Sequence, residues 1–164
     1  FSFLHPTPAA RAGSRSNNAM SCVLRISNGQ RTALLPGDIG AAQERMLLAR
    51  HANDTPETLQ ADVLLVAHHG SKTSTTDAWL NAVQPRHALI QQGYLNPYGH
   101  PHATVLARLH ERPIEVRLSE SCGAAWWRSD TNTVRCERDI NRRYWQHQHR
   151  PAAAVQAHEG INAR

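Results

Sequence analysis

The 164-residue sequence lacks any apolar run approaching the roughly eighteen residues that a membrane span needs, and it does not open with a charged segment followed by an apolar one. Neither a membrane helix nor a secretory leader is predicted in these residues, so the chain taken alone is expected to be soluble. One domain with its own core is expected at this length. The first residue is Phe1, and the alternating apolar segment FSFLHP is typical of a strand already under way, which suggests a fragment of a longer protein.

Cysteine is also scarce. The three residues Cys22, Cys122 and Cys136 are an odd number, and none of them belongs to a CxxC or CxxH motif. The spacing therefore predicts neither a zinc ribbon nor a disulfide framework, and it does not indicate a redox compartment.

The charge balance is a net +5, which favours polyanionic partners. Much of the excess lies in the late segment RCERDINRRYWQHQHR, so the charge favours nucleic acid only weakly. A hydrophobic content of 40% with scattered Gly and Pro is typical of a globular protein. Beyond Asp139 the apolar pattern decays. We therefore predict a globular part over residues 1–137 and a basic, poorly structured tail over residues 138–164.

Two β-prone segments, MSCVLRIS and RTALLPG, are separated by NGQ. An Asn-Gly pair between such segments is the strongest short-range signal for a hairpin. The sequence therefore predicts a β-hairpin over about residues 20–36. The polar segment TPAARAGSRSNN before it is predicted to be a loop.

Downstream, the apolar pattern alternates between helix and strand. Helical spacing follows Asp38 and recurs over residues 75–83 and 102–112, whereas residues 62–67 and 86–92 form apolar runs typical of buried strands. Three further strand segments follow: IEVRLS, CGAAWWRS and TNTVRCE. This order predicts an α/β fold in which helices pack on a mixed sheet.

Polar clusters follow three consecutive predicted β segments: PGD at 36–38, HHGS at 68–71 and NPYGHP at 96–101. Functional groups gather at the carboxyl ends of strands in layered α/β sheets, so these clusters should converge in space. Asp38 with His68, His69 and His100 would be a carboxylate and imidazole set suited to zinc, manganese or iron. Two such metal ions would generate hydroxide and clamp a phosphodiester.

The hydroxyl and ammonium groups after this cluster are predicted to face phosphate near a helix N-terminus; they belong to Ser71, Lys72, Thr73 and Ser74. Other interpretations stay open, since Asp38 alone is more often a helix N-cap and His100 is as often structural. A two-metal site also needs more ligands than these residues supply, and the sequence has no HxHxDH cluster.

The chain resembles the C-terminal half of the metallo-β-lactamase-like domain of the ComEC family of DNA-internalisation competence proteins, over roughly residues 3–128. The resemblance rests on segments in this order: NNAMSCVLRI, LLPGDIG, DVLLVAHHGSKTSTTDAWL, ALIQQGYLNPYGHPHATVLARL and CGAAWW. It implies half of an αββα sandwich, with a mixed sheet and flanking helices.

The resemblance also implies function. It implies that the parent protein resembles an inner-membrane channel that imports single-stranded DNA. In such a protein the β-lactamase-like domain would lie outside the cytoplasm, in the periplasm, and would degrade the strand that is not imported. The implied partners are DNA and the membrane channel of the same parent protein. The implied cofactor is a divalent metal, zinc or manganese, with two ions in the intact domain and no small-molecule cofactor.

Residue by residue, Asp38 matches the metal-bridging aspartate and His69 the late metal-binding histidine, with His68 beside it. The resemblance thus implies a catalytic and metal-binding set and a substrate-binding set near it: Asp38, His68 and His69 for the former, and Ser71, Lys72, Asn96 and His100 for the latter.

The family's early histidine and aspartate cluster is absent from this sequence and would lie upstream of Phe1. The fragment is therefore expected to be incomplete and inactive by itself as a metal-dependent, nuclease-like hydrolase. Two alternatives stay open. One is a non-catalytic DNA-binding or assembly module, and the other is a stand-alone β-lactamase-fold hydrolase acting on another ester.

Overall fold

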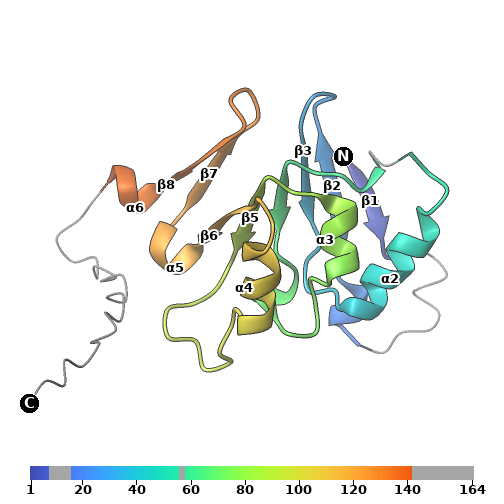
Figure 1. Ribbon diagram of the computed structural model, residues 1–164, viewed down its shortest axis with the longest axis horizontal. Helices are drawn as coiled ribbons and strands as arrows, with labels where there is room; N and C mark the ends of the chain where they lie inside the picture. Colours follow the sequence, from blue (N-terminus) through green and yellow to red (C-terminus); the bar gives the residue numbers. More distant parts are fainter. Residues whose placement is uncertain (8–15, 56–57, 142–164) are drawn as a thin grey trace, which may run out of the picture.

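The structure is a computed structural model that describes residues 1–7, 16–55 and 58–141 (Figure 1). Six strands form one mixed sheet in the order β1-β2-β3-β4-β5-β6. Their bounds are Ser2–His5, Val23–Ser27, Thr32–Leu35, Val63–Leu65, His87–Ile90 and Glu115–Leu118. The first three strands pair antiparallel and the last four pair parallel, which confirms the predicted hairpin and the mixed sheet.

Three helices connect the successive parallel strands: α2 (Ala41–Arg50), α3 (Asp77–Val83) and α4 (Ala103–His110). Because crossovers between parallel strands are right-handed and each new strand is added at the same edge, the three helices belong on one face of the sheet. Figure 1 shows them along the same side. The predicted α/β layering is therefore confirmed.

The core lies between this helix layer and the sheet. Leu34, Leu64 and Ala88 occupy matching positions on β3, β4 and β5 and have no exposed surface. Trp79 on α3 and Leu109 on α4 are equally buried in the same cluster. Each fully buried side chain of this size contributes about 1.5–3 kcal/mol by leaving water.

The opposite face of the sheet is also apolar. Side chains alternate along a strand, so Leu24, Leu35, Leu65 and Leu89 face away from the three helices. All four leucines are only half-buried, and Phe3 beside Leu24 is 69% exposed. This face retains apolar surface that a further layer could cover.

A second, two-stranded sheet follows the main one, formed by β7 (Ala125–Arg128) and β8 (Thr133–Cys136). A short helix, α5 (Ser119–Cys122), precedes it, so the predicted strand CGAAWWRS begins only at Ala125. Cys122 and Cys136 form a disulfide. The cysteine spacing did not indicate this bond, because the hairpin register brings together two cysteines whose spacing matches no sequence motif.

The end of the described chain is α6 (Glu137–Ile140), which lies at the start of the predicted tail. The rest of that tail, residues 142–164, lies outside the described residues, so its predicted lack of structure stays a prediction. Among the residues that the structure describes, no helix combines the length and the apolar character required to cross a membrane.

Candidate functional site

The carboxyl ends of β3 and β4 place Asp38 beside His69. Asp38 follows β3 and precedes α2, whose N-cap is Gly40, so Asp38 is not the helix cap. Its Oδ1 lies 3.5 Å from His69 Nε2, and the two side chains are 40% and 51% exposed. His69 Nδ1 donates a hydrogen bond to the carbonyl of Gln91, just after β5, at 2.9 Å. This bond holds the ring so that Nε2 faces the carboxylate.

The backbone that carries the two histidines is strained. His68 and His69 both adopt left-handed conformations, with φ of 51° and 55°. Such a conformation costs about 1–2 kcal/mol for each residue that is not glycine. Non-glycine residues persist in it when the surrounding structure requires it, and they cluster at functional sites. The strain supports a functional role for this turn.

Gly70 completes the turn and brings a second loop against it. Its φ is +80°, and a Cβ at this position would lie 2.6 Å from the Cβ of Pro101. The backbone carbonyl of Gly70 also accepts a hydrogen bond from the amide of His102 at 2.8 Å. Position 70 therefore requires glycine for two reasons: the left-handed backbone conformation and the close approach of the loop that carries His100.

His68 lies between two other polar side chains, Asn18 and His100. Asn18 donates a hydrogen bond from Nδ2 to His68 Nε2 at 3.1 Å, and the ring of His100 lies 6.2 Å from that of His68. Partial burial lowers the pKa of the His100 imidazole from its ordinary value, and the neighbouring imidazoles of His68, His69 and His102 lower it further. The Nδ1 atom of His100 is buried without a hydrogen-bond partner among the described residues.

Asn96 organises the loop before His100. Its Nδ2 donates to the carbonyl of His100 at 2.7 Å, while its Oδ1 accepts from the amide of the same residue at 3.0 Å. Tyr98, within this loop, is 80% exposed and stacks on His100, with ring centroids 6.1 Å apart and an angle of 22°. The loop thus presents an aromatic surface next to the histidines, with Asn96 holding its ends together.

The hydroxyls after the histidine turn mostly stabilise the loop. Ser71 is buried, with its Oγ 3.1 Å from Thr73 Oγ1, and Ser74 donates to the carbonyls of Ala67 and Ser71. Lys72 is exposed. The predicted substrate-binding role of Ser71 and Lys72 stays a prediction. Of the hydroxyl and ammonium groups in this segment, Lys72 and Thr73 are the exposed ones.

The donors present fit part of a metal site. Asp38 and His69 supply a carboxylate and an imidazole, and a ligating histidine commonly donates its other ring nitrogen to a carbonyl, as His69 does to Gln91. Within residues 1–7, 16–55 and 58–141, no group of three or more His, Cys, Asp or Glu side chains is arranged to hold a metal ion. The described residues therefore offer an incomplete ligand set.

Three contributions were not predicted from the sequence as parts of this site: the Asn18 amide on His68, the Gln91 carbonyl on His69 and the exposed Tyr98. Asn18 lies in a polar segment fifty residues from His68, so only the tertiary fold reveals the pair. A backbone carbonyl carries no sequence signal. Tyr98 could have been noted as an aromatic between two turn motifs.

Comparison with known proteins shows similarity to several bacterial proteins over most of the chain. The chain is 32% identical to Competence protein ComA of Neisseria gonorrhoeae over 147 residues, which cover 89% of the chain. It is 41% identical to Recombination protein 2 of Haemophilus influenzae over 66% of the chain, and 35% identical to ComE operon protein 3 of Bacillus subtilis over 69%. No family model matches the chain.

The matched regions are small parts of these relatives. They make up 20% of the Neisseria protein, 13% of the Haemophilus protein and 14% of the Bacillus protein. The chain therefore spans a fifth or less of the length of each, and the similarity concerns one segment of a much longer protein.

Proposed function

We propose that the chain is the C-terminal part of a metallo-β-lactamase-like domain in a ComEC-type DNA-uptake protein, and that the intact domain is a metal-dependent phosphodiesterase acting on DNA. The similarity to a protein named for competence, one named for recombination and one named for the ComE operon supports the parent protein. The observation that carries the activity is the pairing of Asp38 with an oriented His69 at the carboxyl edge of the sheet.

Asp38 and His69 would hold the divalent metal, zinc or manganese. A metal ion bound there supplies Lewis acidity and lowers the pKa of coordinated water toward neutrality. The Gln91 carbonyl keeps the proton of His69 on Nδ1, which leaves Nε2 free to ligate. Asn18 also orients its histidine, but by donating from Nδ2 to His68 Nε2, so this nitrogen of His68 is occupied by the amide.

Tyr98 and His100 would hold the substrate strand. An exposed tyrosine already stacked on an imidazole offers a flat face to a nucleobase, and base stacking on aromatic side chains contributes roughly 1–3 kcal/mol per base. Burial and the neighbouring imidazoles lower the pKa of His100, which favours the neutral form of its ring. Lys72, exposed on the neighbouring loop, adds a positive charge for phosphate.

The remaining metal ligands and a second sheet would come from a part of the parent outside these residues. The half-buried leucines of the open sheet face support this arrangement, because an αββα sandwich covers that face with another sheet. Contiguous exposed apolar surface of this kind marks an interaction site. The intact domain would also include a second metal ion.

The domain would lie outside the cytoplasm. A disulfide between Cys122 and Cys136 supports this location, because disulfides persist in oxidising compartments such as the bacterial periplasm and are rare in the cytosol. The membrane channel of the same parent would hold the domain at the membrane.

The test is to replace Asp38 by Ala in the full-length parent and to measure bound metal and hydrolysis of labelled DNA. Loss of a ligand should reduce metal content and slow hydrolysis by roughly a hundredfold or more, since even partners outside the ligand shell change affinity or activity by roughly 10–100-fold. Asp54→Ala is the matched control, because Asp54 also pairs with a histidine, His51 at 2.7 Å, just after the C-terminal end of α2. An unchanged rate in Asp38→Ala would refute the assignment.

A second candidate is a DNA-binding module without catalysis, and the exposed Tyr98 stacked on His100 favours it because stacking needs no metal. In that case affinity for single-stranded DNA would fall with added salt but would be indifferent to chelators. Tyr98→Ala would weaken binding, while Asp38→Ala would leave it unchanged.

A further inference from the structure

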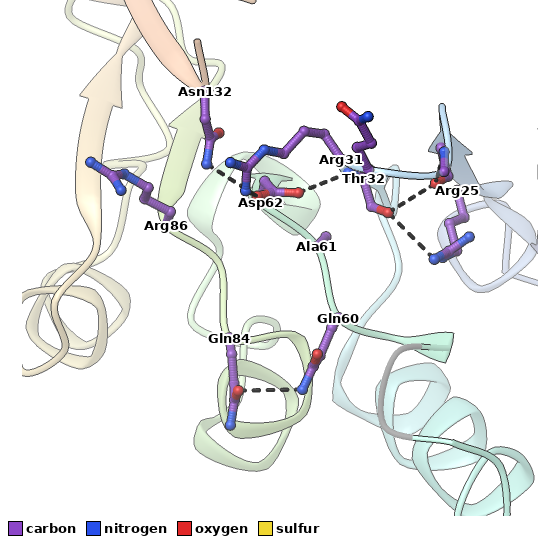
Figure 2. A pocket seen from close by; sticks show the side chains of 12 residues that line it. Arg25, Arg31, Thr32, Gln60, Ala61, Asp62, Gln84, Arg86 and Asn132 are labelled. Atoms are coloured by element: carbon purple, nitrogen blue, oxygen red, sulfur yellow. Dashed lines mark hydrogen bonds and ion pairs between the residues drawn. The ribbon is translucent and has the colours of Figure 1, made fainter. Parts of the chain in front are cut away.

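A polar cavity lies at the edge of the sheet opposite the histidine turn. Thr32, Asp62 and Arg86 line it, and they occupy the first position of β3 and the positions just before β4 and β5 (Figure 2). Asp38 and His69 follow the carboxyl ends of β3 and β4. The cavity therefore lies a full strand length from the proposed metal site and is separate from it.

Two turns form the walls of this cavity. The β2-β3 turn contributes Gly29, Gln30 and Arg31, and the β7-β8 turn contributes Asn132. A hydrogen bond from Asn28 to Ser129, at 3.3 Å, joins the two turns. The cavity has a volume of about 430 Å³, which falls within the range of roughly 300–1,000 Å³ typical of small-molecule sites.

Asp62 is the only carboxylate among the described residues that line the cavity, and three groups of the protein donate hydrogen bonds to it. It accepts from Arg31 Nη1 and from the Thr32 amide, both at 2.8 Å, and from Asn132 Nδ2 at 3.1 Å. Figure 2 shows Arg31 and Asn132 converging on it. Asp62 thus holds the strands and turns together and balances the charge of one guanidinium.

Positive charge exceeds negative charge in the cavity. Besides Arg31, whose side chain is 42% exposed, the lining includes Arg25 and Arg86. Arg25 donates to the Thr32 hydroxyl at 3.3 Å. Arg86 is exposed, and its guanidinium makes no hydrogen bond or ion pair with a described residue. Arg86 can therefore bind a ligand without losing a hydrogen bond or ion pair to any described residue.

The guanidinium and amide groups that line the cavity suit a ligand with both a phosphate and a nucleobase. Guanidinium groups present forked donors that match phosphate oxygens, and they stack on planar rings. Side-chain amides both donate and accept hydrogen bonds, as the edges of nucleobases do, and four of them line the cavity: Gln30, Gln60, Gln84 and Asn132. A single phosphate would use only part of the cavity, whereas a nucleotide would contact both kinds of group.

We propose that this cavity binds the phosphate of a nucleotide between Arg31 and Arg86, with the surrounding amides contacting the base. The nucleotide is either free or part of a DNA strand, and both present the same chemistry. The proposal is independent of the proposed hydrolysis, because it rests on residues at the other edge of the sheet. It adds a second nucleotide-binding position to the chain.

The experiment is calorimetric titration of the full chain with inorganic phosphate, thymidine monophosphate and a ten-residue thymidine oligonucleotide. Arg86→Gln is the main variant, since the Arg86 side chain makes no hydrogen bond or ion pair with a described residue. Arg128→Gln is the matched control, because Arg128 lies on the β7-β8 hairpin that also carries Asn132, is 63% exposed and pairs with Asp130 outside the cavity.

Arg86→Gln should weaken monophosphate binding by roughly ten- to a hundredfold, the range expected for one charge-assisted hydrogen bond, while Arg128→Gln leaves it unchanged. Binding of both nucleotide probes supports a free nucleotide as ligand, and binding of the oligonucleotide alone supports a DNA strand. The proposal is overturned if neither nucleotide probe saturates a site, or if the two variants weaken binding equally.

Discussion

Substituting Gly70 by alanine should destabilise the protein more than the same change at another glycine of the same conformation. At Gly70 the new Cβ would lower the free energy of unfolding in two ways. The left-handed backbone, with φ of +80°, costs about 1–2 kcal/mol for any residue with a side chain. The Cβ would also lie 2.6 Å from Pro101 Cβ and 3.1 Å from its Cα, and such overpacking typically costs about 1–3 kcal/mol.

A Gly29→Ala variant would measure the backbone cost without the steric one. Its φ is +87°, close to that of Gly70, but a Cβ there has no atom within 4 Å. Gly29→Ala should therefore carry only the backbone cost of about 1–2 kcal/mol. The difference between the two variants should be about 1–3 kcal/mol, which is the steric cost at Pro101 alone.

The assay is thermal and urea unfolding of the full chain. For a protein of this size, each 1 kcal/mol shifts Tm by about 2–4 °C, so Gly70→Ala should melt about 2–12 °C below Gly29→Ala. In a Pro101→Gly background, which removes the Cβ in the way, the extra cost of Gly70→Ala should shrink. Equal stability of the two alanine variants would refute the packing of the two loops described here.

Three further results are expected. Cys136→Ser removes the disulfide with Cys122, which closes a separation of 14 residues, and should lower the free energy of unfolding by about 3 kcal/mol in urea titrations. Glu44→Ala leaves two backbone amides before α3 without their acceptor and should cost about 2–5 kcal/mol by the same assay. A hydrogen bond from Arg128 lowers the pKa of Asp130 to about 2 from its ordinary value of 3.8. The stabilisation from this pair should be present above pH 3.8 and lost as the pH falls through 2, and Arg128→Gln should return the pKa, followed by carbon NMR, toward 3.8.

Each of these results has an outcome that would contradict it. Cysteine substitution without loss of stability would mean that the β7-β8 hairpin needs no disulfide. A neutral Glu44→Ala variant would contradict the burial of that carboxylate, which has no exposed surface. An Asp130 pKa that does not respond to Arg128→Gln would assign the shift to another group.

Local sequence patterns were sufficient for most of the fold. The Asn-Gly pair and its flanking apolar segments predicted the β2-β3 hairpin, and apolar periodicity placed the strands and helices that carry Asp38 and His69. Because parallel strands share one carboxyl edge, the order of elements also predicted that Asp38, the histidine turn and His100 would converge. The distances between Asp38 and His69 and between the rings of His68 and His100 confirm this convergence.

Features that depend on distant contacts could not be predicted in this way. The Cys122–Cys136 pairing depends on the register of β7 and β8, and the arginine-lined cavity depends on the meeting of two turns a hundred residues apart in the chain. The conformation of His69 likewise reflects a requirement imposed by the folded loops, since a positive φ is uncommon for residues other than glycine. The conformational propensity of a residue type cannot predict a backbone conformation that the folded loops impose.

The most direct measurement for the central claim is the rate at which the full-length parent hydrolyses an end-labelled DNA strand, compared between wild type and His69→Gln at equal protein concentration with metal in excess. Glutamine keeps the size and polarity of the side chain but removes the imidazole that faces Asp38 at 3.5 Å. If His69 is a metal ligand, the variant should hydrolyse DNA at least roughly tenfold more slowly, even with excess metal. Equal rates for the two proteins would contradict it.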